Sequence, residues 1–166
     1  MILVTLGTQD KPFGRLLEAV EKQIENGNIQ EEVIAQVGST PYTSYRMKII
    51  PYIPVENFSA MLEKANFVIT HAGVGSIIEG LKKKKKMIVA ARKKEYGEHV
   101  NNHQEQILEN FSQSGYIIPL TDFDKLGEAI QQLKDFTPRE FQSNQTKFIE
   151  GLEIQIENLL NGGRNE

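Results

Sequence analysis

The stretch Phe-Val-Ile-Thr-His-Ala-Gly-Val-Gly-Ser-Ile-Ile-Glu-Gly, residues 67–80, decides the fold of this chain. Its apolar start, Phe67–Ile69, is typical of a buried strand in a parallel sheet. Gly73 and Gly75 interrupt the strand, and a helical pattern starts at Ser76. The sequence therefore predicts a strand, a glycine turn and a helix in direct succession.

This succession predicts an anion site at the glycine turn. Glycine lets the backbone approach a ligand closely, and the first N–H groups of a helix point out of its N-terminus. A diphosphate is the natural ligand. Glu79 lies one helical turn beyond Ser76, and we expect its carboxylate to bind a pair of hydroxyls, such as a ribose diol. The alternative is an ordinary strand-to-helix turn with a surface glutamate, because short glycine patterns also occur without ligands.

The composition narrows the class of protein. The chain has 166 residues and a formal net charge of -3, which fits one domain over residues 1–166 and argues against a general nucleic-acid binder. It has no cysteine, which excludes disulfides and thiolate metal sites. The first residues do not match a signal peptide, and no apolar run approaches membrane-spanning length. We therefore expect a cytoplasmic protein.

Apolar runs and turn residues alternate along the rest of the chain. We expect a first helix that is capped by Thr8 or Asp10, and a later one that is capped by Asp122. Helical spacing also predicts a helix over Asn101–Phe111 and a last helix that begins near Pro138. Six strands are predicted, at Ile2–Leu6, Glu32–Val37, Met47–Ile50, Phe67–Ile69, Met87–Ala91 and Tyr116–Leu120.

Strands that alternate with helices in this way predict an α/β fold with an open, doubly wound parallel sheet. Ligands of such sheets bind outside the carboxyl ends of the strands. Gly7, Ile53, Gly73 and the loop 92–99 all follow strands, so we expect them to meet at this edge. The segment Gly7–Gly14 lacks the Gly-Lys-Ser/Thr ending of a Walker loop, which argues against a P-loop nucleotidase.

Three segments together resemble a known family. They are Val-Thr-Leu-Gly-Thr-Gln at residues 4–9, Thr-His-Ala-Gly-Val-Gly-Ser-Ile-Ile-Glu-Gly at 70–80, and Glu-His-Val-Asn-Asn-His-Gln at 98–104. In this order and spacing, the chain resembles the C-terminal, donor-binding half of the family 28 glycosyltransferases, which have the GT-B fold. It is most similar to stand-alone versions of that half. These are the catalytic subunit of the eukaryotic dolichol-linked N-acetylglucosamine transferase and subunits of bacterial two-component exopolysaccharide and capsule transferases. One departure is Lys82–Lys86, where relatives often have a Gly-Lys pair and a proline.

The resemblance implies a UDP-sugar site that is spread over several loops. The loop of Gly7 and Thr8 would face the phosphates, and the backbone around Ile53 would hydrogen-bond the uracil. Glu79 would bind the ribose hydroxyls, in agreement with its position one turn into the helix. Side chains at the start of the helix after residue 102 would contact the sugar. The expected substrate-binding residues are Gly7, Thr8, Ile53, His71, Gly73, Val74, Gly75, Ser76, Glu79, His103 and Gln104.

The resemblance also implies a reaction. The chain would bind a UDP-sugar and transfer the sugar with inversion to a lipid-linked acceptor, in exopolysaccharide, capsule or related glycan synthesis. The helix start would stabilise the charge that grows on the leaving UDP, so we expect no metal and no cofactor. In two-domain relatives the general base lies in the other half, so we expect no catalytic residue in this chain and a membrane-associated partner subunit that supplies the base. Two alternatives are a non-catalytic subunit that binds the nucleotide sugar and enhances a partner transferase, and another GT-B enzyme, such as a UDP-sugar epimerase.

Other residues allow both a functional and a structural interpretation. His99 and His103 are four residues apart, a spacing that would allow a shared metal, but no third ligand is evident. His71 precedes the glycine turn and would either hydrogen-bond phosphates or serve as a structural histidine. The lysine run Lys82–Lys86 is expected to be a solvated helix end, with contact to an anionic membrane surface as the alternative.

Overall fold

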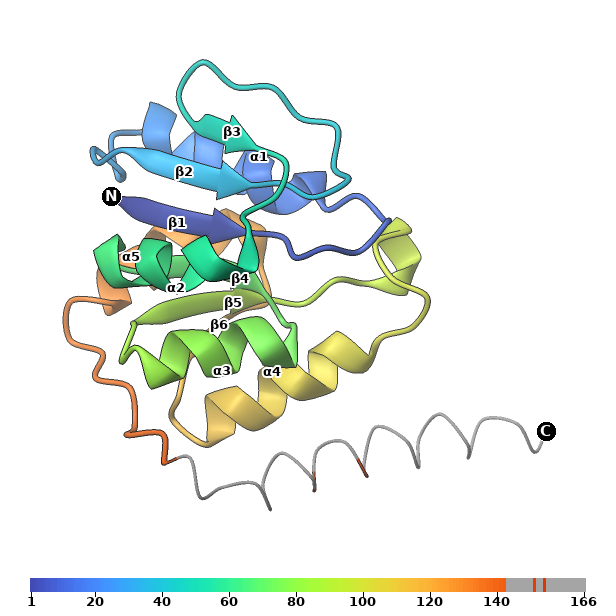
Figure 1. Cartoon of the computed structure of the whole chain (residues 1–166), viewed down its shortest axis with the longest axis vertical. Coiled ribbons are helices and arrows are strands. Elements are labelled where there is room, and N and C mark those ends of the chain that lie inside the picture. Colours follow the sequence, from blue (N-terminus) through green and yellow to red (C-terminus); the bar gives the residue numbers. More distant parts are fainter. Residues whose placement is uncertain (143–150, 152–153, 155–166) are drawn as a thin grey trace.

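The protein is built around one twisted parallel sheet with helices on both faces (Figure 1). The computed structural model describes residues 1–142, 151 and 154. Six strands pair in parallel in the order β3-β2-β1-β4-β5-β6. This is the strand order of a doubly wound nucleotide-binding fold, and it confirms the predicted fold class.

The elements alternate along the chain much as the sequence predicts. The strands are β1 (Ile2–Thr5), β2 (Val33–Gln36), β3 (Lys48–Ile50), β4 (Val68–His71), β5 (Met87–Ala90) and β6 (Ile118–Leu120). The α-helices are α1 (Gly14–Glu25), α2 (Val55–Lys64), α3 (Val74–Lys82), α4 (His103–Gln113) and α5 (Leu126–Gln132). Two short 3-10 helices, η1 (Lys94–Tyr96) and η2 (Phe123–Lys125), complete the described part. Each predicted strand is present, with ends that differ by at most two residues.

The sheet separates two hydrophobic cores, and alternate strand residues enter one or the other. One core lies under α1 and α5, and β1 contributes Ile2 and Val4 to it. The second lies under α2, α3 and α4, and contains Leu3 from the same strand. Because both faces of the central strands are covered, Met87–Ala90 is buried at every position. This double burial explains why the strands appear in the sequence as unbroken apolar runs.

The strand order reverses between β1 and β4. From β1 the chain proceeds outward to β2 and β3, and then returns through α2 to β4 on the other side of β1. The loops that follow β1 and β4 therefore leave the same edge of the sheet in different directions. In doubly wound sheets, ligands bind at this reversal.

The helix starts differ from the sequence predictions in several places. Helix α1 begins after Phe13, not after a cap at Thr8 or Asp10, because the fully buried ring of Phe13 fixes where the chain enters the helix. The N–H of Phe13 donates to Oγ1 of Thr40 instead (3.0 Å). The predicted cap at Asp122 is confirmed, although it caps the short η2.

Helices α3 and α4 also begin at other residues than the sequence suggests. Helix α3 begins at Val74, two residues before the predicted Ser76. Helix α4 begins at His103 and not at Asn101. The predicted start of a last helix near Pro138 is wrong, because residues 138–142 form no helix and the N–H of Arg139 donates to the carbonyl of Gly115 (2.9 Å). Most of the remainder of that predicted helix lies outside the described residues.

The lysine run Lys82–Lys86 lies at the amino ends of the strands, opposite the expected site, where α3 ends and β5 begins. Nζ of Lys85 donates to two carbonyl oxygens at the end of α2, each 2.8 Å away. Nζ of Lys86 donates to the carbonyl oxygen of Leu133, which caps α5 (2.5 Å). The prediction of a merely solvated helix end is therefore wrong for these two lysines, because they bind the terminal carbonyls of one helix on each face.

Both edge strands of the sheet carry residues that are poorly suited to further strand pairing. Pro119 is exposed on β6, as its sequence predicts for a strand near an edge, and Lys48 is exposed on β3. No helix within the described residues has the length and apolar character needed to cross a bilayer.

Candidate nucleotide-sugar site

The start of α3 is an open helix N-terminus. Gly73 occupies the N-cap position and, as a glycine, has no side chain that could cap the helix. The first turn carries no acidic residue. Gly75 is exposed, and a Cβ atom there would meet nothing within 4 Å. Its φ is not positive, so the absence of a side chain and not an unusual backbone is what distinguishes this position. Within the described residues, no hydrogen bond occupies the N–H groups of Val74, Gly75 and Ser76, which lie at the positive end of the helix dipole, where an anion is stabilised.

His71 lies between this turn and the loop that follows β1. A Cβ atom on Gly7 would lie 2.6 Å from Cε1 of the ring, and one on Gly73 would overlap Nε2. Both positions therefore require glycine, because the imidazole ring occupies the space that a side chain would need. Both loops therefore contact the same side chain, that of His71, which is only 7% exposed.

The protonation state of His71 follows from its surroundings. Nδ1 lies 3.4 Å from the carbonyl oxygen of Thr5, which only accepts, and 3.4 Å from Oγ1 of Thr70, whose hydroxyl donates to the carbonyl of His71 (3.3 Å). This arrangement assigns the proton of the neutral ring to Nδ1 and leaves Nε2 as an acceptor. Burial, reinforced by the positive charge of Arg92, lowers the pKa of His71 from 6.5 to about 4. The ring is therefore neutral at physiological pH.

The loop after β1 is held close to the loops that follow β2 and β3. Gly7 has a φ of 75°, in the left-handed region that favours glycine. Its carbonyl oxygen accepts a hydrogen bond from Nε2 of Gln36 (2.8 Å), and the same nitrogen donates to the carbonyl of Pro51 (3.1 Å). Thr8, at the next position, is exposed. The loop thus presents Thr8 to solvent at the carboxyl edge of the sheet.

Ile53 lies in the extended segment between β3 and α2, at the same edge. Its half-buried side chain packs on the core under α2. Within the described residues, no hydrogen bond occupies its backbone N–H or C=O. Tyr52 and Val55 on either side are exposed. This segment has the free peptide groups that recognition of a base requires.

Glu79 lies in the second turn of α3. Its side chain is 43% exposed, and a carboxylate oxygen lies 2.8 Å from Nζ of Lys82 on the same helix. An exposed pair of this kind contributes little to stability, so the carboxylate can exchange its partner at small cost.

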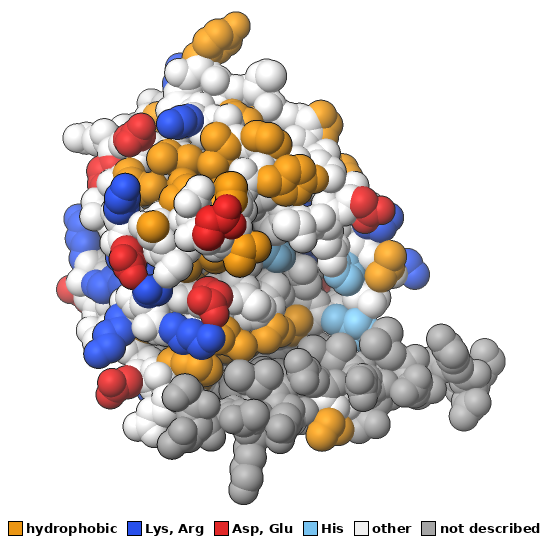
Figure 2. All heavy atoms as spheres, viewed as in Figure 1, with side chains coloured by type: hydrophobic (Ala, Val, Ile, Leu, Met, Phe, Trp, Pro, Cys, Tyr) orange, Lys and Arg blue, Asp and Glu red, His pale blue; other side chains and the backbone are white. Residues whose placement is uncertain are grey.

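The start of α4 supplies the two residues expected to contact the sugar. Gln104 is buried, and its Oε1 accepts the backbone N–H of Arg92 (3.0 Å). Nε2 of His103 is also buried and has no hydrogen-bond partner among the described residues. Nε2 of His99 lies 3.1 Å from Nε2 of Gln9 in the loop after β1. The histidine side chains gather on the side of the molecule toward which the strands point (Figures 1 and 2).

The structure does not support a shared metal at the histidines. His99 precedes α4 and is not on the helix with His103, so the spacing of four residues does not place the two rings on one helical face. No group of three His, Asp or Glu side chains among the described residues is arranged to hold a metal ion.

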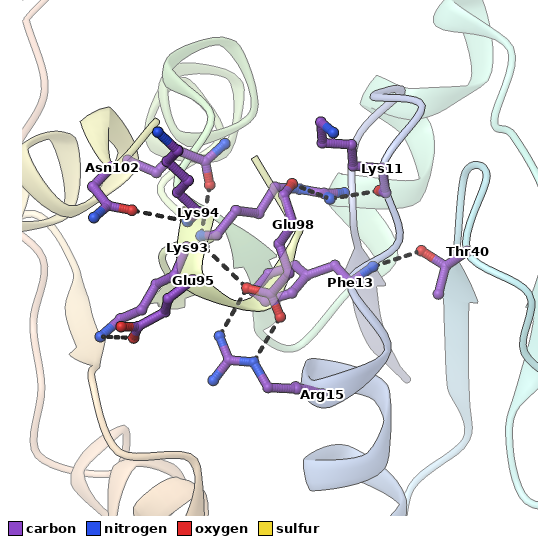
Figure 3. A network of polar contacts seen from close by, with 11 residues as sticks. Lys11, Phe13, Arg15, Thr40, Lys93, Lys94, Glu95, Glu98 and Asn102 are labelled. Atoms are coloured by element: carbon purple, nitrogen blue, oxygen red, sulfur yellow. Dashed lines mark hydrogen bonds and ion pairs between the residues drawn. The ribbon is translucent and has the colours of Figure 1, made fainter. Parts of the chain in front are cut away.

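A polar network beside the site was not predicted from the sequence (Figure 3). The carboxylate of Glu98 accepts two hydrogen bonds from Arg15 on α1, at 2.6 and 2.8 Å, and one from the N–H of Lys93 at 3.0 Å. The guanidinium of Arg15 also lies over the rings of Tyr96 (3.9 Å) and Phe123 (4.3 Å). Arg92 belongs to the same network, because its Nη1 donates to the carbonyl of Glu98 (3.2 Å). It is also the signal in the sequence, since it is a charged residue two positions after the buried strand β5, where a parallel sheet places its functional residues.

Comparison with known proteins places the chain in a family. The model of the glycosyltransferase family 28 C-terminal domain matches residues 1–158. The chain belongs to this family.

Relatives of this family 28 domain include subunits of transferases. It is 29% identical over 142 residues to the "UDP-N-acetylglucosamine transferase subunit ALG13" of Candida glabrata, covering 82% of this chain and 67% of the relative. It is 26% identical over 120 residues to the protein of the same name from Debaryomyces hansenii, covering 72% of this chain but only 52% of that relative. The chain thus spans between half and two thirds of the length of these two relatives.

Solved structures support the fold. The solution structure of ALG13 superposes with a TM-score of 0.55 at 21% identity, over 87% of this chain and 91% of the other. The glycosyltransferase of kitacinnamycin superposes with a TM-score of 0.57 at 22% identity, over 80% of this chain but only 34% of the enzyme. The family 28 domain therefore has the fold of about one third of a complete glycosyltransferase of this type.

Proposed function

We propose that this family 28 domain is the donor-binding, catalytic subunit of a two-component glycosyltransferase. It would bind a UDP-sugar and transfer the sugar with inversion to a lipid-linked acceptor, in exopolysaccharide, capsule or related glycan synthesis. The observation that carries the proposal is the open start of α3, which faces the loop of Gly7 across the ring of His71. The two curated relatives above are named as UDP-N-acetylglucosamine transferase subunits, which supports a UDP-sugar as the donor.

Different residues of the site would bind different parts of the nucleotide sugar. The diphosphate would accept hydrogen bonds from the N–H groups of Gly75 and Ser76 at the start of α3. The carboxylate of Glu79 would exchange Lys82 for the ribose hydroxyls, and the peptide groups at Ile53 would pair with the uracil. The sugar would then extend toward His103, whose buried Nε2 lacks a partner in the described part of the chain.

The chemical contribution of such a site is electrostatic. As the bond between the sugar and UDP breaks, negative charge grows on the leaving phosphate, and helix N–H groups that are already oriented stabilise it without reorganising. The acceptor hydroxyl must also lose a proton to a general base. We assign that base, and the acceptor site, to a membrane-associated partner subunit that closes the site from the side of Gly7 and the loop 92–99. The domain would then act in the cytoplasm, at the inner face of the membrane.

The test is sugar transfer to a lipid-linked acceptor, measured with the purified chain alone and with the protein encoded beside it. A thermal-shift screen over UDP-sugars first identifies the donor, because a ligand that binds only the folded state raises its stability. We expect UDP binding by the chain alone, negligible transfer alone, and transfer when the partner is present. Full turnover by the isolated chain would contradict the division of the active site. Binding without turnover in the complex would instead favour a non-catalytic nucleotide-sugar-binding subunit.

A further inference from the structure

We propose that Arg92 is a positioning residue of the donor site, and that it clamps the loop of Gly7 and Thr8 at both ends. The inference rests on the proposed function, because the family resemblance has this loop facing the phosphates of the UDP-sugar from the side opposite the start of α3. Arg92 is itself 1% exposed, so it would act through the loop and not by touching the ligand.

The clamp spans the reversal point of the sheet. Arg92 follows β5, whereas the loop follows β1, and β4 lies between these two strands. Nη2 of Arg92 donates to the carbonyl of Leu6 (2.6 Å), directly before Gly7. Nη1 donates to the carbonyl of Lys11 (2.7 Å), at the other end of the loop. One planar guanidinium thus fixes the distance between the two ends of segment 7–10.

Besides Arg92, Gln36 binds the base of the loop, where its Nε2 donates to the carbonyl of Gly7 (2.8 Å). Three consecutive residues in it, Thr8, Gln9 and Asp10, are exposed. Its tip is bound by Gln9, whose Nε2 lies 3.1 Å from Nε2 of His99. Because His99 and Arg92 belong to the same segment, loop 7–10 is attached at its base and at its tip to residues 92–99. The two segments should therefore move as one unit.

Arg92 is in turn held in place from several sides. Its Nη1 also donates to the carbonyl of Glu98 (3.2 Å), and its backbone N–H donates to Gln104 (3.0 Å). The guanidinium lies 5.0 Å from the centre of the Phe13 ring, which is buried at the end of the same loop. The carboxylate of Glu98 is hydrogen-bonded to Arg15, as Figure 3 shows, so Glu98 anchors the segment to α1 and acts on the side chain of Arg92 only through its charge.

The choice of partners favours positioning over simple stabilisation. A buried cation is costly unless it is paired, and a residue selected only for stability would be expected to face a carboxylate. Among the described residues, the side chain of Arg92 donates only to backbone carbonyls, those of Leu6, Lys11 and Glu98, and the carboxylates of Glu98 and Asp10 act on it through their charge alone. Charge-assisted hydrogen bonds to carbonyls fix the path of the backbone, which is what a loop that orients peptide groups toward phosphates requires.

The test compares Arg92→Met and Arg92→Lys with the wild type. Arg46→Lys is the matched control. Arg46 is half-exposed, lies just before the outermost strand β3, and forms a long ion pair with Glu25 (3.7 Å). Order parameters of the backbone N–H groups of residues 7–11 are measured first, by NMR relaxation without ligand. We expect them to fall from the rigid range, about 0.85, to below about 0.6 in Arg92→Met, to an intermediate value in Arg92→Lys, whose single ammonium cannot hold both carbonyls in the same plane, and to stay unchanged in the control.

Calorimetric binding of UDP and of uridine is measured next. We expect UDP to bind about tenfold more weakly to Arg92→Met, the loss of about one hydrogen bond to a charged group, whereas uridine affinity changes by less than about twofold. Unchanged order parameters in residues 7–11 would refute the clamp. Lower order parameters with unchanged UDP affinity, or an equal loss for UDP and uridine, would refute the positioning role. A wild type that binds no UDP would overturn the proposed function and the positioning role with it, whereas the order parameters would still decide the clamp.

Discussion

Acidification should destabilise this fold through His71. The pKa of this buried ring falls from 6.5 to about 4 on folding, mainly because burial penalises the charged form and because Arg92 adds a second positive charge. Between pH 6.5 and 4, the unfolded chain therefore binds a proton that the folded chain does not, so the free energy of unfolding decreases as the pH falls. At 1.36 kcal/mol for each pKa unit, the loss across this window is about 3 kcal/mol, complete near pH 4.

Urea unfolding at several pH values between 7 and 4 measures this loss. The matched variant is His71→Asn, because the asparagine amide can donate to the carbonyl of Thr5 as Nδ1 does, but does not titrate. This variant should be less stable at pH 7 and should lose much less stability on acidification. His99, whose pKa is lowered mainly by partial burial, acts in the same direction, and His99→Asn separates its share. If wild type and His71→Asn show the same pH dependence, the assignment of the buried neutral ring is refuted.

Further changes should separate binding from folding. Gly73→Ala should lower the free energy of unfolding by about 1–3 kcal/mol in urea, because its methyl group overlaps the ring of His71. Gly75→Val should keep a normal melting temperature and lose UDP affinity but not uridine affinity, since nothing within 4 Å opposes a Cβ atom there; equal loss of both ligands would contradict this. Glu79→Ala should weaken UDP binding in calorimetry by about 1.5–3 kcal/mol in a folded protein, and unchanged affinity would remove Glu79 from the ribose site. Lys86→Met should cost about 1 kcal/mol of stability and leave UDP affinity unchanged, because it lies at the opposite edge of the sheet.

The sheet could be predicted from the sequence because its strands are covered on both faces. Runs such as Met87–Ala90 are apolar at every position, and the chain between them has helical spacing. The glycine turn could also be predicted, since Gly73 and Gly75 follow such a run directly. Ligands of such sheets bind at the carboxyl ends of the strands, so Gly7, Ile53 and Gly73, which follow strands, could be expected to lie together at that end.

The contacts across the site could not be predicted, because they depend on residues far apart in the chain. The partners of Arg92 in the first loop are 81 and 86 residues away, and Arg15 is 83 residues from Glu98. Local pattern also failed at the start of α1, where burial of Phe13 outweighs the capping preference of Thr8 and Asp10. Short-range rules describe which element forms, whereas tertiary packing decides where it begins.

The two edge strands have a consequence for how this protein can associate. The edge strands of an open sheet have unpaired N–H and C=O groups that can pair with a strand from another molecule. Repeated pairing of this kind would extend the sheet from molecule to molecule and lead to aggregation. On β6, Pro119 offers no N–H to an incoming strand, and on β3 the exposed Lys48 would have to give up part of its hydration. Association by strand addition is therefore disfavoured at either edge. The partner subunit proposed above should instead recognise side chains and loops, which makes the choice of partner depend on surface sequence and not on backbone pairing.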